Sequence, residues 1–429
     1  MIWVMLGLLL ATMLLGIPIL LCIALIGFIG IAAEPGVVMP MFAQKSFAQL
    51  DSYTLLALPF FILAGALMTA GGMSQQLVDF SRVLVGHLRA GLAHASVVCS
   101  MILSGVSGSS TADASAIASV LVPTMKQNGY KAGFAAALIA TAGTIGAIIP
   151  PSMTMVVYGA IAQVSIGGLF LGGILPGILV GLFLMAVVKM YTYHPRYPEL
   201  RVTHGHFEWT PLWRSLAEVW PALLGPLVII GGILGGIFTA TEAGVVACLY
   251  AFVVGYFWYR KIRLRDLKDI FVDAAITTTM VSAVIAVSGA MGWLLAYMQF
   301  NDMAVAWVTN ASKNPYVVLL VFAVVMIILG TFVDSLAILL VFAPVAVELC
   351  KRYGIDPIQM GLVMVICNQI GAVSPPTAPL LFVTTNIART TLDDTTRHVW
   401  PFFAAECVAL IVVIFVPGLS TWIPRYFLG

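Results

Sequence analysis

The chain has 429 residues, of which 61% are hydrophobic and 9% are charged. A soluble domain usually carries about 25% charged residues, so this composition excludes an ordinary soluble fold. The apolar residues fall in blocks that match the roughly 20 residues of a membrane-spanning helix, and they do not alternate as in a β-barrel. The formal net charge of +2 gives no indication of a nucleic-acid partner. We therefore expect an all-α polytopic membrane protein.

Uninterrupted apolar blocks predict membrane-spanning segments along the whole chain. They lie near residues 2–31, 53–72, 133–162, 169–190, 219–239, 243–259, 271–298, 358–388 and 399–424. The first block fits either one tilted span or two short helices that turn near Gly16, Ile17 and Pro18. The stretch 74–91 places its large apolar residues on one helical face, which is typical of a helix at the membrane surface.

Two further blocks, 92–127 and 316–349, have a different pattern. Each holds two short apolar stretches separated by small or polar residues, SGVSGSSTAD at 104–113 and LGTFVDS at 329–335. We expect each block to form a re-entrant hairpin, which enters and leaves the membrane on the same side. Asp113 and Asp334 follow the two tips, where they fit either a helix N-cap or a role in binding an ion or proton.

Double prolines interrupt two of the apolar blocks. Pro150-Pro151 lies in the middle of 133–162, and Pro375-Pro376 lies in the middle of 358–388. Because each proline removes a backbone donor and clashes with the preceding turn, these blocks predict two broken helices. Lipid cannot satisfy the carbonyl groups that a break exposes, so such a break survives where it lines a cavity or binds an ion.

The basic residues predict the orientation of the chain. Threading it through the predicted spans and hairpins puts fifteen of the twenty Lys and Arg residues on one side, which the positive-inside rule makes cytoplasmic. These are Arg82, Arg89, Lys126, Lys131, Lys189, Arg196, Arg201, Arg214, Arg260, Lys261, Arg263, Arg265, Lys268, Arg389 and Arg397. Lys45, Lys313, Lys351, Arg352 and Arg425 face the outside.

The second half of the chain repeats the first. DASAIASVLVP from Asp113 matches DSLAILLVFAP from Asp334, and IGAIIPP from Ile145 matches IGAVSPP from Ile370. In the predicted topology the two copies start on opposite sides, so we expect inverted repeats, which are typical of secondary transporters with a midplane binding site. The predicted divisions are N-terminal scaffold helices at 1–52, transport repeat 1 at 53–190, a cytoplasmic connector with scaffold helices at 191–270, and transport repeat 2 at 271–429.

Pairing the tips with the breaks predicts the chemistry of the site. Unwound carbonyls suit a monovalent cation, whereas helix N-termini face anions. In the repeat register Ser110 pairs with Thr331, so two tips facing two breaks would make two cation sites with an anionic substrate between them. The cysteines have no metal-ligand spacing, and we expect no cofactor.

Two other classes of protein compete with a transporter. GVSG at 105–108 resembles the serine motif of rhomboid-type intramembrane proteases, but that enzyme needs a membrane-embedded histidine as base. Only His94 lies in an apolar block, in the same segment as the serine, and the repeat would stay unexplained. A channel is the second rival, and two closed tips favour occlusion over an open pore. We therefore expect no enzyme and no catalytic residue.

Four stretches taken together resemble one family of membrane proteins. GSSTADASAIASVLVPTMKQNGY, GAIIPPSMTMVVYG, GGIFTATEAGVVA and NIARTTLDDTTRHVWPF are similar to the large membrane (M) subunit of tripartite ATP-independent periplasmic (TRAP) transporters. The resemblance covers essentially the whole chain. It implies an elevator-type, sodium-coupled importer of an organic acid anion, such as sialic acid or a C4-dicarboxylate, in the bacterial inner membrane. An autonomous sodium/dicarboxylate symporter of related fold is the alternative.

The resemblance also implies partners, a small membrane (Q) subunit and a periplasmic substrate-binding (P) protein. The outer loop 34–53 and the segment 301–315 would receive the binding protein. Carrying over the family's sodium sites gives one set with Ser107, Ser109, Ser110, Gly146 and Pro150, and a second with Gly330, Thr331, Asp334, Gly371, Ser374 and Thr377. The implied substrate contacts are Ser110, Thr111, Pro151, Ser152, Thr331, Pro376 and Thr377. Pro375-Pro376-Thr377-Ala378 departs from the PPVG of many relatives, which puts the last contacts in doubt.

Overall fold

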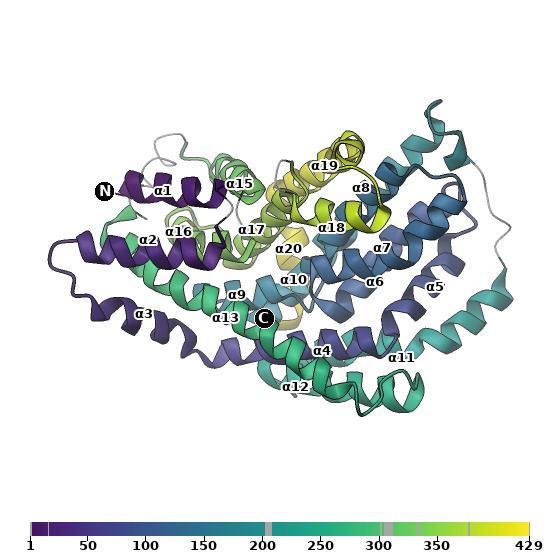
Figure 1. Cartoon of the computed structure of the whole chain (residues 1–429), viewed down its shortest axis with the longest axis horizontal. Helices are drawn as coiled ribbons and strands as arrows, with labels where there is room; N and C mark the ends of the chain where they lie inside the picture. The colour runs from purple at the N-terminus through teal and green to yellow at the C-terminus, as the bar shows by residue number, and fades with distance from the viewer. Residues whose placement is uncertain are drawn as a thin grey trace.

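The computed structural model describes residues 2–15, 17–201, 208–300, 303, 312–332, 335–375 and 378–428. The elements of these residues are helices, and none is a strand (Figure 1). Six are long and apolar enough to cross a membrane by length and composition. This agrees with the predicted all-α polytopic fold.

The first predicted span consists of two short helices, which decides between the two alternatives. Helix α1 (Ile2–Leu14) and helix α2 (Ile19–Ala33) pack against each other, with Pro18 at the start of the second. The segment 34–53, expected to be an outer loop, contains helix α3 (Pro40–Leu50), which packs against α13 (Leu267–Tyr297). The expectation of a loop is wrong because Pro40 begins a run of residues that favour a helix.

The first hairpin and the first broken helix form as predicted. A short turn, η1 (Tyr53–Leu56), leads into α4 (Ala57–Ala70), and α5 (Met73–Val85) follows after a bend of 65° with its apolar face buried. The hairpin consists of α6 (Gly91–Ser107) and α7 (Ser110–Gln127). The broken helix consists of α8 (Ala132–Gly143), η2 (Thr144–Ala147) and, after the double proline, α9 (Met153–Ala162).

Long helices connect the two halves of the chain. Helix α10 (Ile166–Tyr193) is followed by the turn η3 (Pro198–Arg201), α11 (Trp209–Leu234) and α12 (Ala240–Val253). The turn η4 (Val254–Trp258), a π-helical extension of α12, precedes α13. Helix α11 begins well before the predicted start of its span at residue 219, since its first turns carry the amphipathic sequence WTPLWRSLAEVW.

The second half repeats the order of the first. Helices α15 (Pro315–Phe332) and α16 (Ser335–Tyr353) make the second hairpin, and α17 (Pro357–Ala372) and α18 (Pro379–Ala388) make the second broken helix. The predicted span 399–424 is wrong at its end, because α19 (Leu392–Phe415) stops before Pro417 and α20 (Gly418–Leu428) follows. Proline disfavours helical geometry in the residue before it, here Val416.

Contacts between the halves are crosswise. Helix α7 of the first hairpin packs on α18 of the second broken helix, and α16 of the second hairpin packs on α9 of the first. In Figure 1 the first hairpin lies in the right half of the molecule and the second in the left half. This arrangement agrees with two copies that point in opposite directions. The division into scaffold and transport parts stays a prediction.

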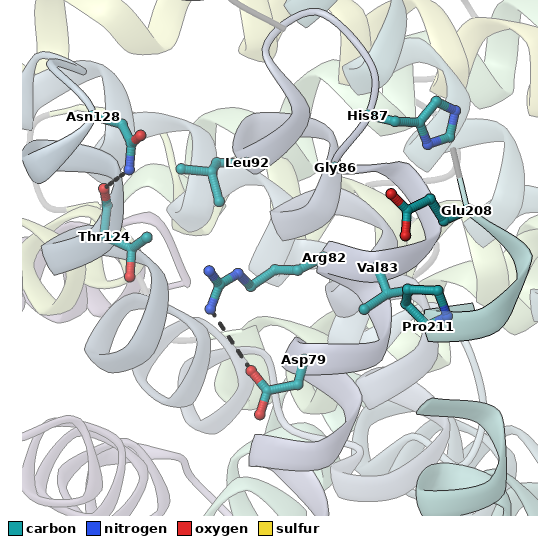
Figure 2. A pocket seen from close by; sticks show the side chains of 10 residues that line it. All are labelled: Asp79, Arg82, Val83, Gly86, His87, Leu92, Thr124, Asn128, Glu208 and Pro211. Carbon is teal, nitrogen blue, oxygen red and sulfur yellow. Dashed lines mark hydrogen bonds and ion pairs between the residues drawn. The ribbon is translucent and has the colours of Figure 1, made fainter. Parts of the chain in front are cut away.

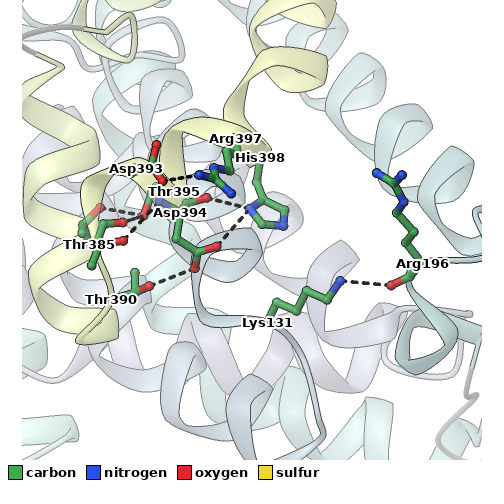
Figure 3. A network of polar contacts seen from close by, with 10 residues as sticks. Lys131, Arg196, Thr385, Thr390, Asp393, Asp394, Thr395, Arg397 and His398 are labelled. Carbon is green, nitrogen blue, oxygen red and sulfur yellow. Dashed lines mark hydrogen bonds and ion pairs between the residues drawn. The ribbon is translucent and has the colours of Figure 1, made fainter.

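The open end of the first hairpin is bound to the connector and to the second half. Lys131 Nζ donates to the carbonyl oxygen of Arg196 at 3.1 Å, and Lys126 Nζ donates to that of Ala388 at 3.1 Å. Beside them, Thr390 donates to the Asp394 carboxylate at 2.9 Å, and an Arg397–Asp393 ion pair lies nearby (Figure 3). Residues predicted to be cytoplasmic therefore gather at one end.

Residues predicted to lie outside gather around the second hairpin. The Tyr353 hydroxyl donates to the carbonyl oxygen of Ser312 at 3.1 Å, and Arg425 forms an ion pair with Asp356 at 3.0 Å. Helices α8 and α17, the first arms of the two broken helices, lie deeply buried between these ends. Every residue in 133–143 and in 359–372 is buried. The candidate site is built on these arms.

Candidate functional site

The tip of the first hairpin is a tight turn stabilised by its own side chains. Gly108 has a φ of +65°, which favours glycine, and Ser109 caps α7 by accepting a hydrogen bond from the Ala112 amide at 3.5 Å. The Ser107 hydroxyl donates to the Asp113 carboxylate and accepts from the Ser109 amide at 3.2 Å. The N-cap role considered for Asp113 is therefore wrong, because Ser109 fills it and Asp113 lies buried one turn later.

The first tip packs directly on the first break, and glycine makes this contact possible. A Cβ atom added to Gly108 would lie 2.4 Å from the carbonyl oxygen of Pro151. A Cβ atom added to Gly146 would lie 2.6 Å from Asp113 Oδ2 and 3.0 Å from Ser110 Cα. The structure thus brings together the predicted residues of the first sodium set around the tip and the break.

The second tip meets the second break in the same way. A Cβ atom added to Gly371 would lie 2.5 Å from the backbone carbon of Gly330. Thr331 is buried and its hydroxyl donates to the carbonyl oxygen of Ile327 at 3.0 Å, while the buried Ser374 lies just before the double proline. Three predicted site residues, Asp334, Pro376 and Thr377, lie outside the described residues.

The first tip is hydrogen-bonded to the second half of the chain at this centre. The Ser110 hydroxyl donates to Gln369 Oε1 at 2.6 Å, so the first tip is joined to the second broken helix. The neighbouring Asn368 amide donates to the carbonyl oxygen of Ser335, at the start of α16, at 3.1 Å. Sequence reasoning missed both amides. The signal was present, because they are adjacent polar residues in a run otherwise expected to be buried.

The predicted substrate contacts differ in the exposure of their side chains and in their hydrogen bonds. Thr111 is exposed, and its hydroxyl lies 3.3 Å from that of Ser109. Ser152 is 1% exposed and caps α9, with its hydroxyl donating to the carbonyl oxygen of Ala147 at 2.6 Å. The Ser152 hydroxyl is thus engaged within the break, whereas Thr111 lies at the accessible edge of the tip.

A buried carboxyl group that the sequence analysis missed stands behind the first break. Glu406 of α19 is 1% exposed, and its Oε1 lies 2.6 Å from the Thr144 hydroxyl, which is also 2.6 Å from the carbonyl oxygen of Thr141. A hydroxyl group has one hydrogen, so both contacts are hydrogen bonds when Glu406 carries a proton and donates to Thr144. Glu406 is an ionisable residue within an apolar run, which is typical of a functional intramembrane group.

The two buried carboxyl groups share a further feature. Asp113 Oδ2 and Glu406 Oε2 have no hydrogen-bond partner in the part of the chain that the structure describes. The Asp113 carboxyl group accepts a hydrogen bond from the Ser107 hydroxyl, and the Glu406 carboxyl group is hydrogen-bonded to the Thr144 hydroxyl. Unpaired oxygen atoms of this kind are the groups that a bound cation or a proton would satisfy.

A cavity of about 580 Å³ lies away from this centre (Figure 2). It lies at the open end of the first hairpin, between α5, α7 and the start of α11, and its lining carries Asp79, Arg82 and Glu208. Arg82 and Asp79 lie one turn apart on α5 and form an ion pair at 3.8 Å. The charged residues that line this cavity are of both signs and partly paired. The candidate site is therefore assigned to the tips and breaks rather than to this cavity.

Two hairpins whose tips pack on two broken helices, inside a multi-pass helical bundle, define the fold of a membrane transporter. A solved structure, that of the YdaH transporter of Alcanivorax borkumensis, matches it with a TM-score of 0.66 at 14% identity, covering 90% of each chain. That likeness shows the fold. The family model described as "Tripartite ATP-independent periplasmic transporter, DctM component" matches residues 6–419.

Curated relatives agree with that family. The C4-dicarboxylate TRAP transporter large permease protein DctM of Pseudomonas aeruginosa is 38% identical over 90% of this chain and 89% of that protein. The sialic acid TRAP transporter large permease protein SiaM of Vibrio cholerae is 34% identical over 90% of both. The isethionate TRAP transporter permease protein DctMQ of Oleidesulfovibrio alaskensis is 34% identical over 96% of this chain and 64% of that protein. The chain belongs to the TRAP transporter large permease family and is a multi-pass membrane protein.

Proposed function

We propose that this chain is the transport subunit of a sodium-coupled importer for an organic acid anion. The observation that carries the proposal is the paired packing of tip on break, with Gly146 against the first tip and Gly371 against the second. Each pair gathers hydroxyl groups and unwound carbonyl groups in the protein interior. Such oxygen-rich places at a helix break suit a monovalent cation.

The first sodium ion would lie between Ser107, Ser109 and Ser110 of the tip and the break around Gly146 and Pro150. The second would lie between Gly330, Thr331 and Asp334 and the break around Gly371, Ser374 and Thr377. The anion would lie between these positions, near Thr111 and the start of α9. The short contact between Ser110 and Gln369 supports this placement, since it brings the two half-sites to one centre.

The movement proposed for transport is of elevator type. The hairpins and broken helices form one closely packed unit, because α7 packs on α18 and α16 packs on α9. Such a unit can move as a body against the remaining helices, carrying ions and anion together. The location would be the bacterial inner membrane, with the predicted basic end in the cytoplasm.

Two partners complete the proposal. A small membrane subunit would pack against the helices that do not belong to the moving unit, and a periplasmic binding protein would deliver the anion. The name of the related DctMQ protein, and the share of its length that this chain covers, support a membrane partner. The word "tripartite" in the family description supports a third component.

Uptake in the complete system tests the proposal. The chain, its small membrane subunit and its binding protein are reconstituted in liposomes and offered labelled organic acids, including succinate and sialic acid. We expect concentrative uptake of one class of acid with an inward sodium gradient, and none when potassium replaces sodium. Equal uptake with both cations would contradict sodium coupling.

A further inference from the structure

A second cavity, of about 330 Å³, lies between α3 and α13 on one side and α9 and α16 on the other. Its volume falls within the roughly 300–1,000 Å³ range of small-molecule sites. The residues that line it combine polar groups with small and apolar ones. The polar and aromatic ones are Lys45, Gln49, Ser288 and Trp293.

The polar groups of this cavity are suited to a negatively charged ligand. Lys45 Nζ lies 5.4 Å from the centre of the Trp293 ring, which holds the ammonium group beside the cavity. Ser288 is 2% exposed, and its hydroxyl has no hydrogen-bond partner among the described residues. No Asp or Glu is among the described residues that line the cavity. A positive charge and an unused buried donor therefore face the same space.

The internal repeat indicates why a cavity occurs here. Gly65 in ILAGALM of α4 and Gly289 in AVSGAMG of α13 are 224 positions apart, close to the shift of 225 between IGAIIPP and IGAVSPP, so they correspond in the repeat. Their neighbours differ. A Cβ atom on Gly65 would lie 3.0 Å from the carbonyl oxygen of Ser107, so α4 lies against the tip of the first hairpin. Gly289 instead lies against Gln49 and lines the cavity. The two repeats therefore pack differently around these two glycines, and a space remains beside Gly289. Alternating access requires such a difference between the two repeats.

We propose that this cavity is a receiving site for a carboxylate group of the organic anion. The Lys45 ammonium group supplies the charge, and the Gln49 amide and the Ser288 hydroxyl donate hydrogen bonds to the carboxylate oxygens. The inference rests on the proposed function, because it names where the transported anion is first held. The wall of the cavity includes α9 and α16, which belong to the proposed moving unit, so closing that unit would carry the anion inward.

Trp293 provides a direct probe of binding. The chain in complex with its small membrane subunit, in detergent, is titrated with succinate and with sialic acid while tryptophan fluorescence is recorded. We expect one of these carboxylates to give a saturable change, because drawing Lys45 toward an anion alters its contact with the indole ring. Trp293→Phe should remove the change.

Variants of the lining residues test the charge of Lys45 separately from the hydroxyl group of Ser288. Lys45→Gln should weaken binding about tenfold, as expected for a hydrogen bond to a charged group, and Lys45→Arg should restore most of it. Ser288→Ala should weaken binding less. Lys268→Gln, which changes an exposed lysine of α13 outside the cavity, is the matched control and should leave binding unchanged.

Uptake by the complete transporter distinguishes failure of the receiving site from failure of the proposed function. If wild-type uptake is driven by sodium but Lys45→Gln and Ser288→Ala both keep the wild-type apparent affinity, the receiving site is wrong and the proposed function stands. If the wild-type complex shows no sodium-driven uptake, the proposed function itself fails. A fluorescence change that persists in Trp293→Phe would also overturn the site.

Discussion

Hydroxyl groups at the centre of the molecule are bonded in ways that the repeat alone does not predict. Ser110 and Thr331 correspond in the repeat, yet Ser110 donates across the molecule to Gln369, whereas Thr331 donates to the carbonyl oxygen of Ile327 in its own helix. The two hydroxyl groups therefore donate to different acceptors, a side-chain amide for Ser110 and a main-chain carbonyl group for Thr331. Single substitutions should affect the two proposed sodium positions unequally.

Removing either hydroxyl group tests the sodium positions. Ser110→Ala and Thr331→Ala should each raise the sodium concentration needed for half-maximal uptake, with the protein still folded. We expect the larger effect for Ser110→Ala, because it also leaves Gln369 without its donor. Ser119→Ala is the matched control, since that serine is exposed on the same helix α7. Unchanged sodium activation in both variants would refute the placement.

Glu406 gives a second prediction at this scale. Glu406→Gln keeps a donor and an acceptor beside Thr144, so the stability and the uptake should stay close to those of the wild type. Glu406→Leu removes both and leaves a buried hydroxyl with one partner fewer, which should cost about 1–3 kcal/mol of unfolding free energy. Thermal unfolding in detergent measures the difference.

Infrared spectroscopy checks the proton itself. A protonated carboxyl group has a carbonyl stretch distinct from that of a carboxylate, and the band of Glu406 should be missing in Glu406→Gln. A carboxylate band that disappears instead would show that Glu406 is ionised, and that the hydrogen-bond arrangement around Thr144 is different from the one described.

Close approach of backbones defines the site at the scale of the elements. The second tip and the second break touch through Gly330 and Gly371, with no room for a side chain between them. Overpacking such a contact forces backbone shifts that typically cost about 1–3 kcal/mol. The second hairpin therefore fits against its broken helix through the shape of the two backbones.

A methyl group inserted at this contact should separate the tip from the break. Gly371→Ala should lower both the stability and the sodium affinity, since the added Cβ would meet the Gly330 backbone. Gly231→Ala is the matched control, because a Cβ at this helical position meets nothing within 4 Å and alanine favours a helix. Equal behaviour of the two variants in thermal unfolding and uptake would contradict the packing.

Sequence patterns predicted the elements well where the signal is local. Hydrophobic length and the double prolines were enough for the hairpins and broken helices, and amphipathic spacing was enough for α5. The helix in 40–50 was missed, because a short, partly polar helix has no membrane-length signal. The end of α19 was missed because the apolar run continues through Pro417.

The centre of the site was less predictable for a physical reason. Contacts such as Ser110 with Gln369 join residues 259 positions apart, and no spacing along the chain indicates them. Three polar residues lie on buried helices, and their role depends on which residues they contact in the folded chain. They are Asn368, Gln369 and Glu406. The repeat predicted two tips facing two breaks, and the family resemblance implied which tip lies on which break, but neither indicated the crosswise bonds.

Opposite orientation of the two hairpins is a property of the whole molecule. Lys126 and Lys131 lie with the end of α18 and the connector, whereas Tyr353 and Asp356 lie with Ser312 and α20. This separation is the structural counterpart of the inverted repeat. It gives the membrane orientation a direct test.

Labelling of single cysteines checks this orientation. In a variant without the native cysteines, five of which are buried, cysteine is placed at Lys126, Lys131, Lys351 or Arg352. An impermeant thiol reagent applied from outside intact cells should label the last two positions and not the first two. Labelling of both pairs from one side would refute inverted repeats.

The central claim is that this chain moves an organic anion with sodium as part of a three-component system. The most direct measurement is sodium-driven uptake in proteoliposomes to which the components are added one at a time. We predict negligible uptake of free substrate by the chain alone, and restored uptake once the small membrane subunit and the loaded binding protein are both present. Robust sodium-driven uptake by the isolated chain would contradict this account and indicate an autonomous symporter.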